Sequence, residues 1–226
     1  MRTAILGAGG HGRVALDCLR LLQPKGLKVV FYDDQYEHLQ SVDGVEVRGP
    51  IYDVLRGGTW DGVFVAIGDN ATRMRGAERM TKRQLRLLRI VHPQTIVSPN
   101  ASIGDGSIAI AGAVVNTGAH VGRCSILNTL SSVGHGCIVE DYAQLASGVN
   151  LGGAAIVGRG AFLGIGAKVV PEVRIGAWSV VGAGSVVLHD LPDRAFCHGV
   201  PARVVRQLDP DERPSSAAEP GKRRNP

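Results

Sequence analysis

Aromatic residues are scarce in this chain of 226 residues: they make up 4% of it, although 44% of the residues are hydrophobic. A core made mostly of Val, Ile, Leu and Ala predicts a narrow interior with no room for rings. No apolar run approaches the ~20 residues of a membrane span, and the start, MRTAILGAGG, does not resemble a signal peptide. The four cysteines form no CxxC pair, so we expect free thiols in a cytoplasmic protein that does not bind membranes.

The charge is moderate, with a net value of +5, and part of it lies at the C-terminus. Residues 209–226 are polar, basic and proline-bearing, which predicts a disordered tail. Basic and aromatic residues do not alternate as single-stranded nucleic acid requires, so we expect no nucleic-acid partner. The positive charge instead suits a phosphorylated small molecule.

The first part of the chain, residues 1–92, alternates strand and helix signals. An apolar TAIL run leads into the loop GAGGHG, and the following RVALDCLRLL has helical spacing. A second strand, LKVVFYDD, ends in Asp33 and Asp34, and a third, GVFVAIGDN, turns at Gly68. This order predicts a small Rossmann-like α/β domain with a parallel sheet.

The next part, residues 93–190, follows a six-residue period without a break. Sixteen residues at this spacing form one series, aliphatic throughout, in which Ala109 is the only small member: Val97, Ile103, Ala109, Val115, Val121, Leu127, Val133, Val139, Leu145, Leu151, Val157, Leu163, Val169, Ile175, Val181 and Val187. Small residues stand two positions earlier, and glycine often follows. This pattern predicts a parallel β-helix in which three hexapeptides form one triangular coil of about 18 residues.

Open ends of a β-helix expose unpaired strand edges. We expect the α/β domain to cap one end and residues 191–208 to shield the other, where they would also contact the cofactor.

The hexapeptide array, together with GAGGHG, the Asp33–Asp34 pair, AIGDNATR and the closing HGVPARVV, resembles the bacterial nucleotide-sugar N-acetyltransferases of the left-handed β-helix acyltransferases. The resemblance covers the whole chain except the tail, and it implies the left hand of the β-helix. It also implies acetyl-CoA as cosubstrate and a nucleotide-linked 4-amino-4,6-dideoxysugar as acceptor. The family packs three chains side by side, with acetyl-CoA between two of them. The sialic-acid O-acetyltransferases are close relatives, so O-acylation is an alternative.

The first GHG, Gly10 to Gly12, belongs to a G-x-G-x-x-G loop between a strand and a helix, and Asp33 stands about 20 residues further on. A helix N-terminus with bare N–H groups binds any pyrophosphate, so the spacing alone leaves NAD open. The resemblance favours a nucleotide sugar. It assigns substrate binding to these residues: Gly9, Gly10, His11, Asp33, Asp34, Gly68, Asn70 and Arg73.

The second GHG contains His135, which the hexapeptide register turns outward between Thr117 and Gly153 of the adjacent coils. An imidazole titrates near neutral pH and can serve as a general base. We predict that His135 takes a proton from the sugar amine during attack on acetyl-CoA, with the Gly153 N–H facing the oxyanion. Cys137 points inward, which argues against a cysteine nucleophile.

Two positions depart from the family pattern. The relatives usually follow the histidine with a carboxylate, but here Gly136 stands there, and Glu140 or Asp141 is the candidate substitute, from another position of the same chain or from the neighbouring chain. They also carry a second histidine nine residues on, where this chain has Gln144. The resemblance assigns cofactor binding to Gln144, Gly153, Ile165, Ala183, Pro201 and Arg203, with Arg203 pairing with a phosphate.

A zinc enzyme and a catalytically inactive binding protein are the two other candidate classes. Zinc enzymes also use this fold, but they need three converging histidines, and the spacing of His120, His135 and His189 does not provide them. We therefore expect no metal. A catalytically inactive nucleotide-sugar-binding protein is the other alternative, and the missing carboxylate at Gly136 is its main support.

Overall fold

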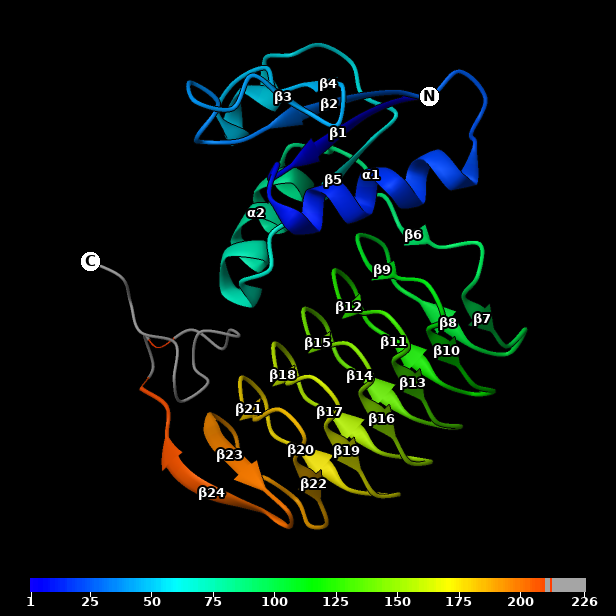
Figure 1. The fold of residues 1–226 in the computed structure, drawn as a ribbon, viewed down its shortest axis with the longest axis vertical. Coiled ribbons are helices and arrows are strands. Elements are labelled where there is room, and N and C mark those ends of the chain that lie inside the picture. Colours follow the sequence, from blue (N-terminus) through cyan, green and yellow to red (C-terminus); the bar gives the residue numbers. More distant parts are fainter. Residues whose placement is uncertain (210–211, 213–226) are drawn as a thin grey trace.

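The computed structural model describes residues 1–209 and 212. It has two parts, an α/β half and a β-solenoid, drawn in Figure 1 at the top and below. The predicted tail, residues 209–226, lies outside the described residues except for Asp209 and Glu212. Arg194 donates a hydrogen bond to the Asp209 carbonyl at 3.2 Å, and Arg206 pairs with the Glu212 carboxylate.

The α/β half is built on a parallel sheet with the order β2-β1-β5. Its elements are β1 (Arg2–Leu6), α1 (Gly10–Leu22), β2 (Lys28–Tyr32), the hairpin β3 (Ser41–Val42) and β4 (Val45–Glu46), the 3-10 helix η1 (Ile51–Leu55), β5 (Gly62–Val65) and α2 (Asn70–Lys82). Four of the five β1 residues and all four β5 residues are buried, as expected for parallel strands covered on both sides.

The solenoid has three faces, each a sheet of parallel two-residue strands, to which face 3 adds a longer parallel strand and a final antiparallel strand (Figure 1). Face 1 contains β7 (Ile96–Val97), β10 (Val114–Val115), β13 (Ser132–Val133), β16 (Asn150–Leu151), β19 (Lys168–Val169) and β22 (Val186–Val187). Face 2 contains β8 (Ser102–Ile103), β11 (His120–Val121), β14 (Ile138–Val139), β17 (Ile156–Val157) and β20 (Arg174–Ile175). Face 3 contains β6 (Ile90–Val91), β9 (Ile108–Ala109), β12 (Ile126–Leu127), β15 (Gln144–Leu145), β18 (Phe162–Leu163), β21 (Val180–Val181), β23 (Ala195–Gly199) and β24 (Ala202–Gln207).

Each face is followed by a corner of the same number. In one coil, residues 134–137 form corner 1, residues 140–143 form corner 2 and residues 146–149 form corner 3. The predicted register is confirmed, because every inward residue of the series from Ile103 to Val187 is at most 6% exposed. The first of the series, Val97, is 36% exposed at the open end.

The α/β half covers a side of the solenoid rather than its open end, which differs from the expectation. Outward-facing Ile90, Ile108 and Ile126 of face 3 share a core cluster with Leu16 of α1 and Phe31 of β2. Beyond the last coil, β23 pairs with β21 and with antiparallel β24, and Phe196 and Ala202 join the solenoid core. The chain after Val187 therefore extends face 3 and closes that end.

Candidate active site

The glycine loop leaves the N-terminus of α1 open. A Cβ on Gly7 would lie 2.8 Å from the Ala66 carbonyl oxygen, and one on Gly12 would lie 2.1 Å from the Gly7 carbonyl oxygen. These two glycines therefore permit close packing of loop and helix. At Gly9 and Gly10 an added Cβ meets nothing within 4 Å, and no side chain caps the helix. The exposed N–H groups can bind an anion such as a diphosphate.

A cleft of about 410 Å³ lies beside this loop, between Gly9–Gly10 and the β3–β4 hairpin. Arg13 and Asp43, both lining residues, form a two-point ion pair at 2.9 Å. The Asp43 carboxylate raises the pKa of Arg13 by hydrogen bonding. Sequence reasoning missed this pair, because no spacing links a helix residue to a hairpin residue 30 positions on. The one sequence signal for this pair is that Arg13, a basic residue, stands in the first turn of α1.

Asp33 and Asp34 hold the backbone around this cleft. Asp33 accepts hydrogen bonds from the Ala8 and Gln35 N–H groups at 2.7 and 2.8 Å, so its carboxylate fixes the glycine loop. Asp34 is exposed and accepts one from the Ile51 N–H at 3.0 Å, at the start of η1. Both have positioning roles in this structure, and a contact with the nucleotide remains a prediction.

Asn70 and Arg73 are turned away from the cleft and join the two halves. Asn70 is fully buried and donates to the Gly160 and Ala161 carbonyls at 3.0 and 3.3 Å. Arg73, 1% exposed, donates to the Cys124 and Tyr142 carbonyls, both at 2.8 Å. These bonds fasten α2 along corner 2. Because their side chains are buried in these bonds, we leave both residues out of the proposed substrate site.

A second cavity, of about 250 Å³, lies between the glycine loop and the outer surface of face 3. Its lining residues come from both halves: Gly10, His11, Val14, Gly68, Ile110, Ile126, Asn128 and Gln144. The Nε2 atom of His11 and the Oε1 atom of Gln144 are buried and have no hydrogen-bond partner among the described residues. Burial, with a smaller effect of the Arg73 charge, lowers the pKa of His11 to about 4. The ring is therefore neutral at pH 7.

His135 lies at corner 1, exposed to solvent. Its ring lies above Gly153 of the next coil. A Cβ added to Gly153 would be 2.4 Å from the Cε1 and Nε2 atoms of the His135 ring. Gly136 has a positive φ of 66°, and a Cβ there would meet nothing within 4 Å. Cys137 is fully buried, burial raises the pKa of its thiol, and Sγ bonds the Gly152 carbonyl at 3.0 Å. This environment disfavours a nucleophilic thiolate.

Most predicted cofactor residues lie along corner 3. Ile165 and Ala183 are exposed residues of successive corner 3 turns, and the Gly199 N–H bonds the Ser185 hydroxyl at 3.1 Å. That bond brings the β23–β24 turn, which contains Pro201, next to this corner, with exposed Arg203 following on β24. Gly153 lies at corner 1 instead, and Gln144 lies on face 3.

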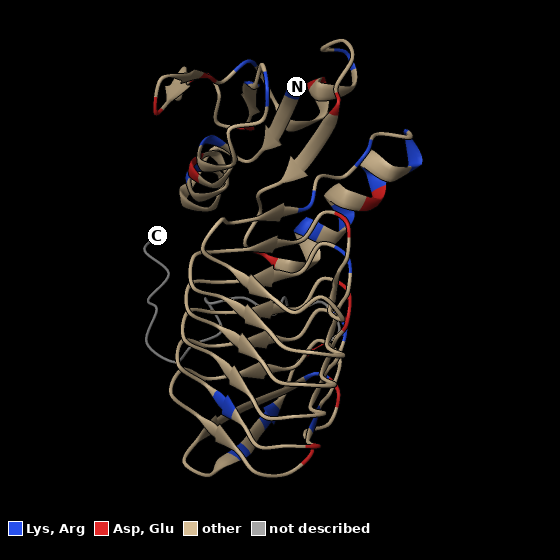
Figure 2. Ribbon diagram, turned by 90° about the vertical axis from the view of Figure 1, so that its right-hand side faces the viewer, with Lys and Arg blue, Asp and Glu red and all other residues tan. Residues whose placement is uncertain are grey.

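Corners 2 and 3 differ in charge and in the state of their N–H groups. Charged residues gather along one edge of the solenoid, beside α2, and are sparse on its strands (Figure 2). At corner 2, carboxylates accept hydrogen bonds from the N–H groups of Arg123, Arg159 and Ala177. Within the described chain, the N–H groups of Ile165 and Ala183 at corner 3 have no acceptor. Corner 3 thus offers free donors to a ligand with carbonyl groups.

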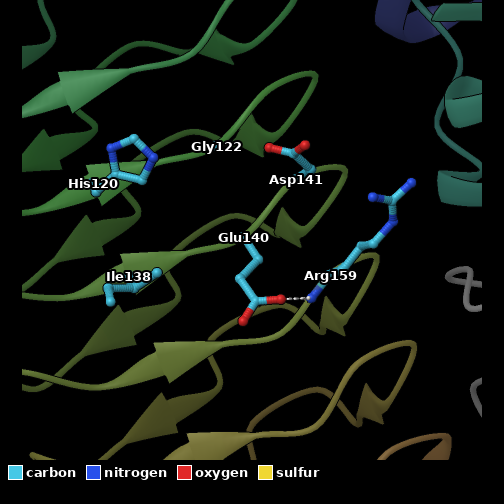
Figure 3. A pocket seen from close by; sticks show the side chains of 6 residues that line it. All are labelled: His120, Gly122, Ile138, Glu140, Asp141 and Arg159. Atoms are coloured by element: carbon cyan, nitrogen blue, oxygen red, sulfur yellow. Dashed lines mark hydrogen bonds between the residues drawn. The ribbon is translucent and has the colours of Figure 1, made fainter. Parts of the chain in front are cut away.

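Another hollow, of about 250 Å³, lies on face 2 (Figure 3). Glu140 accepts a hydrogen bond from the Arg159 N–H at 2.9 Å, and Asp141 accepts one from the Arg123 N–H at 2.7 Å. Both carboxylates are at corner 2, at the opposite end of β14 from His135. The idea that either one replaces the missing carboxylate beside His135 is therefore wrong within a single chain.

Neither a candidate metal site nor a candidate membrane-spanning helix lies among the described residues. No group of three His, Cys, Asp or Glu residues there has a geometry that could hold a metal ion. No helix among them has the length and apolar character needed to cross a membrane.

Comparison with known proteins agrees with this architecture. A family model described as the PglD N-terminal domain matches residues 2–80, and one described as six bacterial transferase hexapeptide repeats matches residues 154–189. The GDP-perosamine N-acetyltransferase of Escherichia coli O157:H7 is 30% identical over 188 residues, which cover 80% of this chain and 82% of that protein.

The solved structures that resemble the whole fold include those of two acetyltransferases. The acetyltransferase domain of PglB from Neisseria gonorrhoeae, in complex with acetyl coenzyme A, has a TM-score of 0.86 and 32% identity and covers 90% of this chain and 98% of that one. A variant of perosamine N-acetyltransferase from Caulobacter crescentus, in complex with CoA and GDP-perosamine, has a TM-score of 0.84 and 35% identity. It covers 90% of this chain and 96% of that chain.

The hexapeptide solenoid and its agreement with these structures place the chain among the left-handed β-helix acyltransferases. The chain is an acetyltransferase of that class. The α/β half, joined to the solenoid across face 3, narrows the assignment. The chain belongs to the family of nucleotide-sugar N-acetyltransferases that includes the GDP-perosamine enzymes.

Proposed function

We propose that this protein transfers the acetyl group of acetyl-CoA to the 4-amino group of a nucleotide-linked 4-amino-4,6-dideoxysugar. One observation carries the proposal: the open helix N-terminus at Gly9–Gly10 borders the same cavity as Gln144 and Asn128 of the solenoid. A diphosphate bound to α1 would direct its sugar toward face 3 and corner 3. The family relationship, including relatives with bound CoA and GDP-perosamine, supports this substrate pair.

Acetyl-CoA fits corner 3. Its pantetheine arm is uncharged and rich in amide groups, and the turns at Ile165 and Ala183 present free N–H groups and no charged side chain. Arg203, exposed at the end of this corner, would pair with a phosphate of the nucleotide part. The thioester would then lie near the cavity that receives the sugar.

His135 would act as general base. The amine nitrogen attacks the thioester carbon while the imidazole accepts the proton that the nitrogen loses. A free N–H, such as that of Gly153 beneath the ring, stabilises the oxyanion. When the C–S bond breaks, the departing thiolate takes up a proton, which the imidazolium can return. The products are the amide and CoA, without an acyl-enzyme.

Two chains are needed to complete this site. His135 lies at corner 1, whereas the cofactor residues lie at corner 3, and face 1 separates the two corners by about six residues, or roughly 20 Å. We infer a homotrimer in which corner 1 of one chain meets corner 3 of the next. Because both corners border face 1, closing the ring turns the three copies of face 1 toward the axis.

The first measurement is the thermal stabilisation of the protein by UDP-, GDP- and dTDP-linked amino sugars. The second is the rate at which the protein releases free thiol from acetyl-CoA in the presence of the amino sugar. His135→Ala should reduce turnover by ~10²-fold or more while substrate binding is kept. His189→Ala is a matched control, since His189 is exposed at the same corner three coils further on, and it should retain activity. Near wild-type turnover of His135→Ala would remove the proposed base, and a monomer in light scattering would rule out the shared site.

A further inference from the structure

The cavity between the glycine loop and face 3 contains two unsatisfied polar atoms that the proposed chemistry does not use. Among the described residues, five buried side-chain atoms lack a hydrogen-bond partner, and two of the five, His11 Nε2 and Gln144 Oε1, belong to residues that line this cavity. A buried polar atom without a hydrogen-bond partner destabilises the folded protein. Two such atoms in one cavity of about 250 Å³ indicate that a ligand group belongs there.

The lining restricts the chemistry of that group. No residue of the lining carries a charge, since His11 is neutral and the others are apolar, glycine or amide. A phosphate or carboxylate would find no cation, and an ammonium would find no anion. A hydroxyl suits both atoms, because it can donate to Gln144 Oε1 and accept from an Nε2–H of His11.

The position restricts the source of the hydroxyl. Gly10 and Gly68, at the carboxyl ends of β1 and β5, form the wall on the nucleotide side, and Asn128 at corner 3 forms the wall on the cofactor side. The group that spans these walls is the sugar attached to the diphosphate. The reacting amine must reach His135 of the neighbouring chain, so a different substituent of the ring faces this cavity.

We propose that His11 and Gln144 together recognise a ring hydroxyl of the acceptor sugar, and that Gln144 serves the sugar rather than acetyl-CoA. This inference rests on the proposed function, because it presumes a nucleotide-linked sugar at the glycine loop. It revises the sequence-based assignment of Gln144 to the cofactor.

The experiment compares Gln144→Met, which keeps the length of the side chain and removes the amide, with the wild type. Calorimetry measures binding of GDP-perosamine and of GDP, and steady-state kinetics measures the KM for acetyl-CoA. The nucleotide is exchanged for UDP or dTDP if those stabilise the wild type better. We expect affinity for the amino sugar to fall tenfold or more, while affinity for the free nucleotide and the KM for acetyl-CoA change less than twofold. Gln144→Asn, which retains an amide, should recover part of the loss.

The outcomes separate the possibilities. A higher KM for acetyl-CoA alone would return Gln144 to the cofactor site and overturn the inference. If the affinities for the free nucleotide and for the nucleotide sugar fell equally, the role of Gln144 would be merely structural. If both affinities stayed unchanged, the cavity would hold only water. Either result also overturns the inference. If the wild type binds no nucleotide sugar at all, the proposed function fails first.

Discussion

At the scale of single residues, Gly153 determines where the His135 ring can lie. The ring occupies the space that a side chain at position 153 would need, and a Cβ would come within 2.4 Å of two ring atoms. The backbone at Gly153 does not have the positive φ that favours glycine. The glycine is therefore required by the imidazole rather than by the turn.

Gly153→Ala should displace the imidazole and leave the fold intact. Misplacing a catalytic group by about 1 Å can reduce a rate by up to 10²-fold, and we expect kcat to fall by at least tenfold. The measurement is kcat for Gly153→Ala, for His135→Ala and for the double variant. The alanine at position 153 should have no further effect in the His135→Ala background. An unchanged kcat in the single variant would contradict the geometry described.

His11 should make stability depend on pH. Its pKa is about 4 in the folded protein and 6.5 when unperturbed, so below pH 6.5 the unfolded chain binds a proton that the folded chain does not. Its contribution to stability is therefore lost as the pH falls from 6.5 towards 4, by about 3 kcal/mol at most. Urea unfolding at pH 7 and pH 4.5 should show a smaller decrease for His11→Gln than for the wild type. Equal decreases would contradict a neutral, buried ring.

At the scale of elements, the buried cation Arg73 joins α2 to the solenoid, together with Asn70. Besides its two bonds to corner 2, Arg73 donates to the Ile67 and Gly68 carbonyls and to Asn70 Oδ1, at 2.9, 3.2 and 2.7 Å. Burial lowers its pKa to about 10, so it remains charged at neutral pH. The same side chain thus orders the Gly68 loop, which lines the cavity proposed for the sugar.

Arg73→Met should destabilise the protein by about 3 kcal/mol, because several buried carbonyls lose their donor. It should also weaken nucleotide-sugar binding through the Gly68 loop. Arg75→Met is the matched control, because Arg75 is exposed on the same helix and its side chain donates a hydrogen bond to the Thr72 hydroxyl at 2.9 Å. Urea unfolding of the two variants provides the measurement, and similar midpoints would show that the buried network contributes little.

Elements whose pattern is local were predictable from the sequence. The hexapeptide register identified the inward residues, and it turned His135 outward above Gly153, because every coil repeats the same short-range contacts. The docking of the α/β half was predicted at an open end of the solenoid, whereas the structure places it on face 3. Yet Ile108 and Ile126, 18 residues apart at outward positions, indicated a covered face. Asn70 and Arg73 could not be assigned from the sequence, since their partners are 51 to 91 residues away in coils that only the folded chain brings near.

At the scale of the whole molecule, a single chain separates the parts of its own site. The nucleotide loop and corner 3 lie on one side of face 1, and His135 lies on the other. Ile96, 67% exposed at the start of face 1, is an apolar residue that an assembly about this face would cover. Each active site would then take residues from two neighbouring chains. The activity of a trimer that contains two different variants would therefore depend on which variants are neighbours.

Mixed trimers test this arrangement. His135→Ala removes the base, and Gly10→Asp puts a carboxylate where the diphosphate would bind, at a position with room for a side chain; each should be inactive alone. Co-expressed with different tags and purified through both, the two variants should regain activity. Every trimer purified through both tags contains both variants, so one of its three sites combines an intact loop from one chain with an intact His135 from its neighbour. If each chain used its own His135 and its own loop, no mixture would contain an intact site, and the mixed trimers would remain inactive.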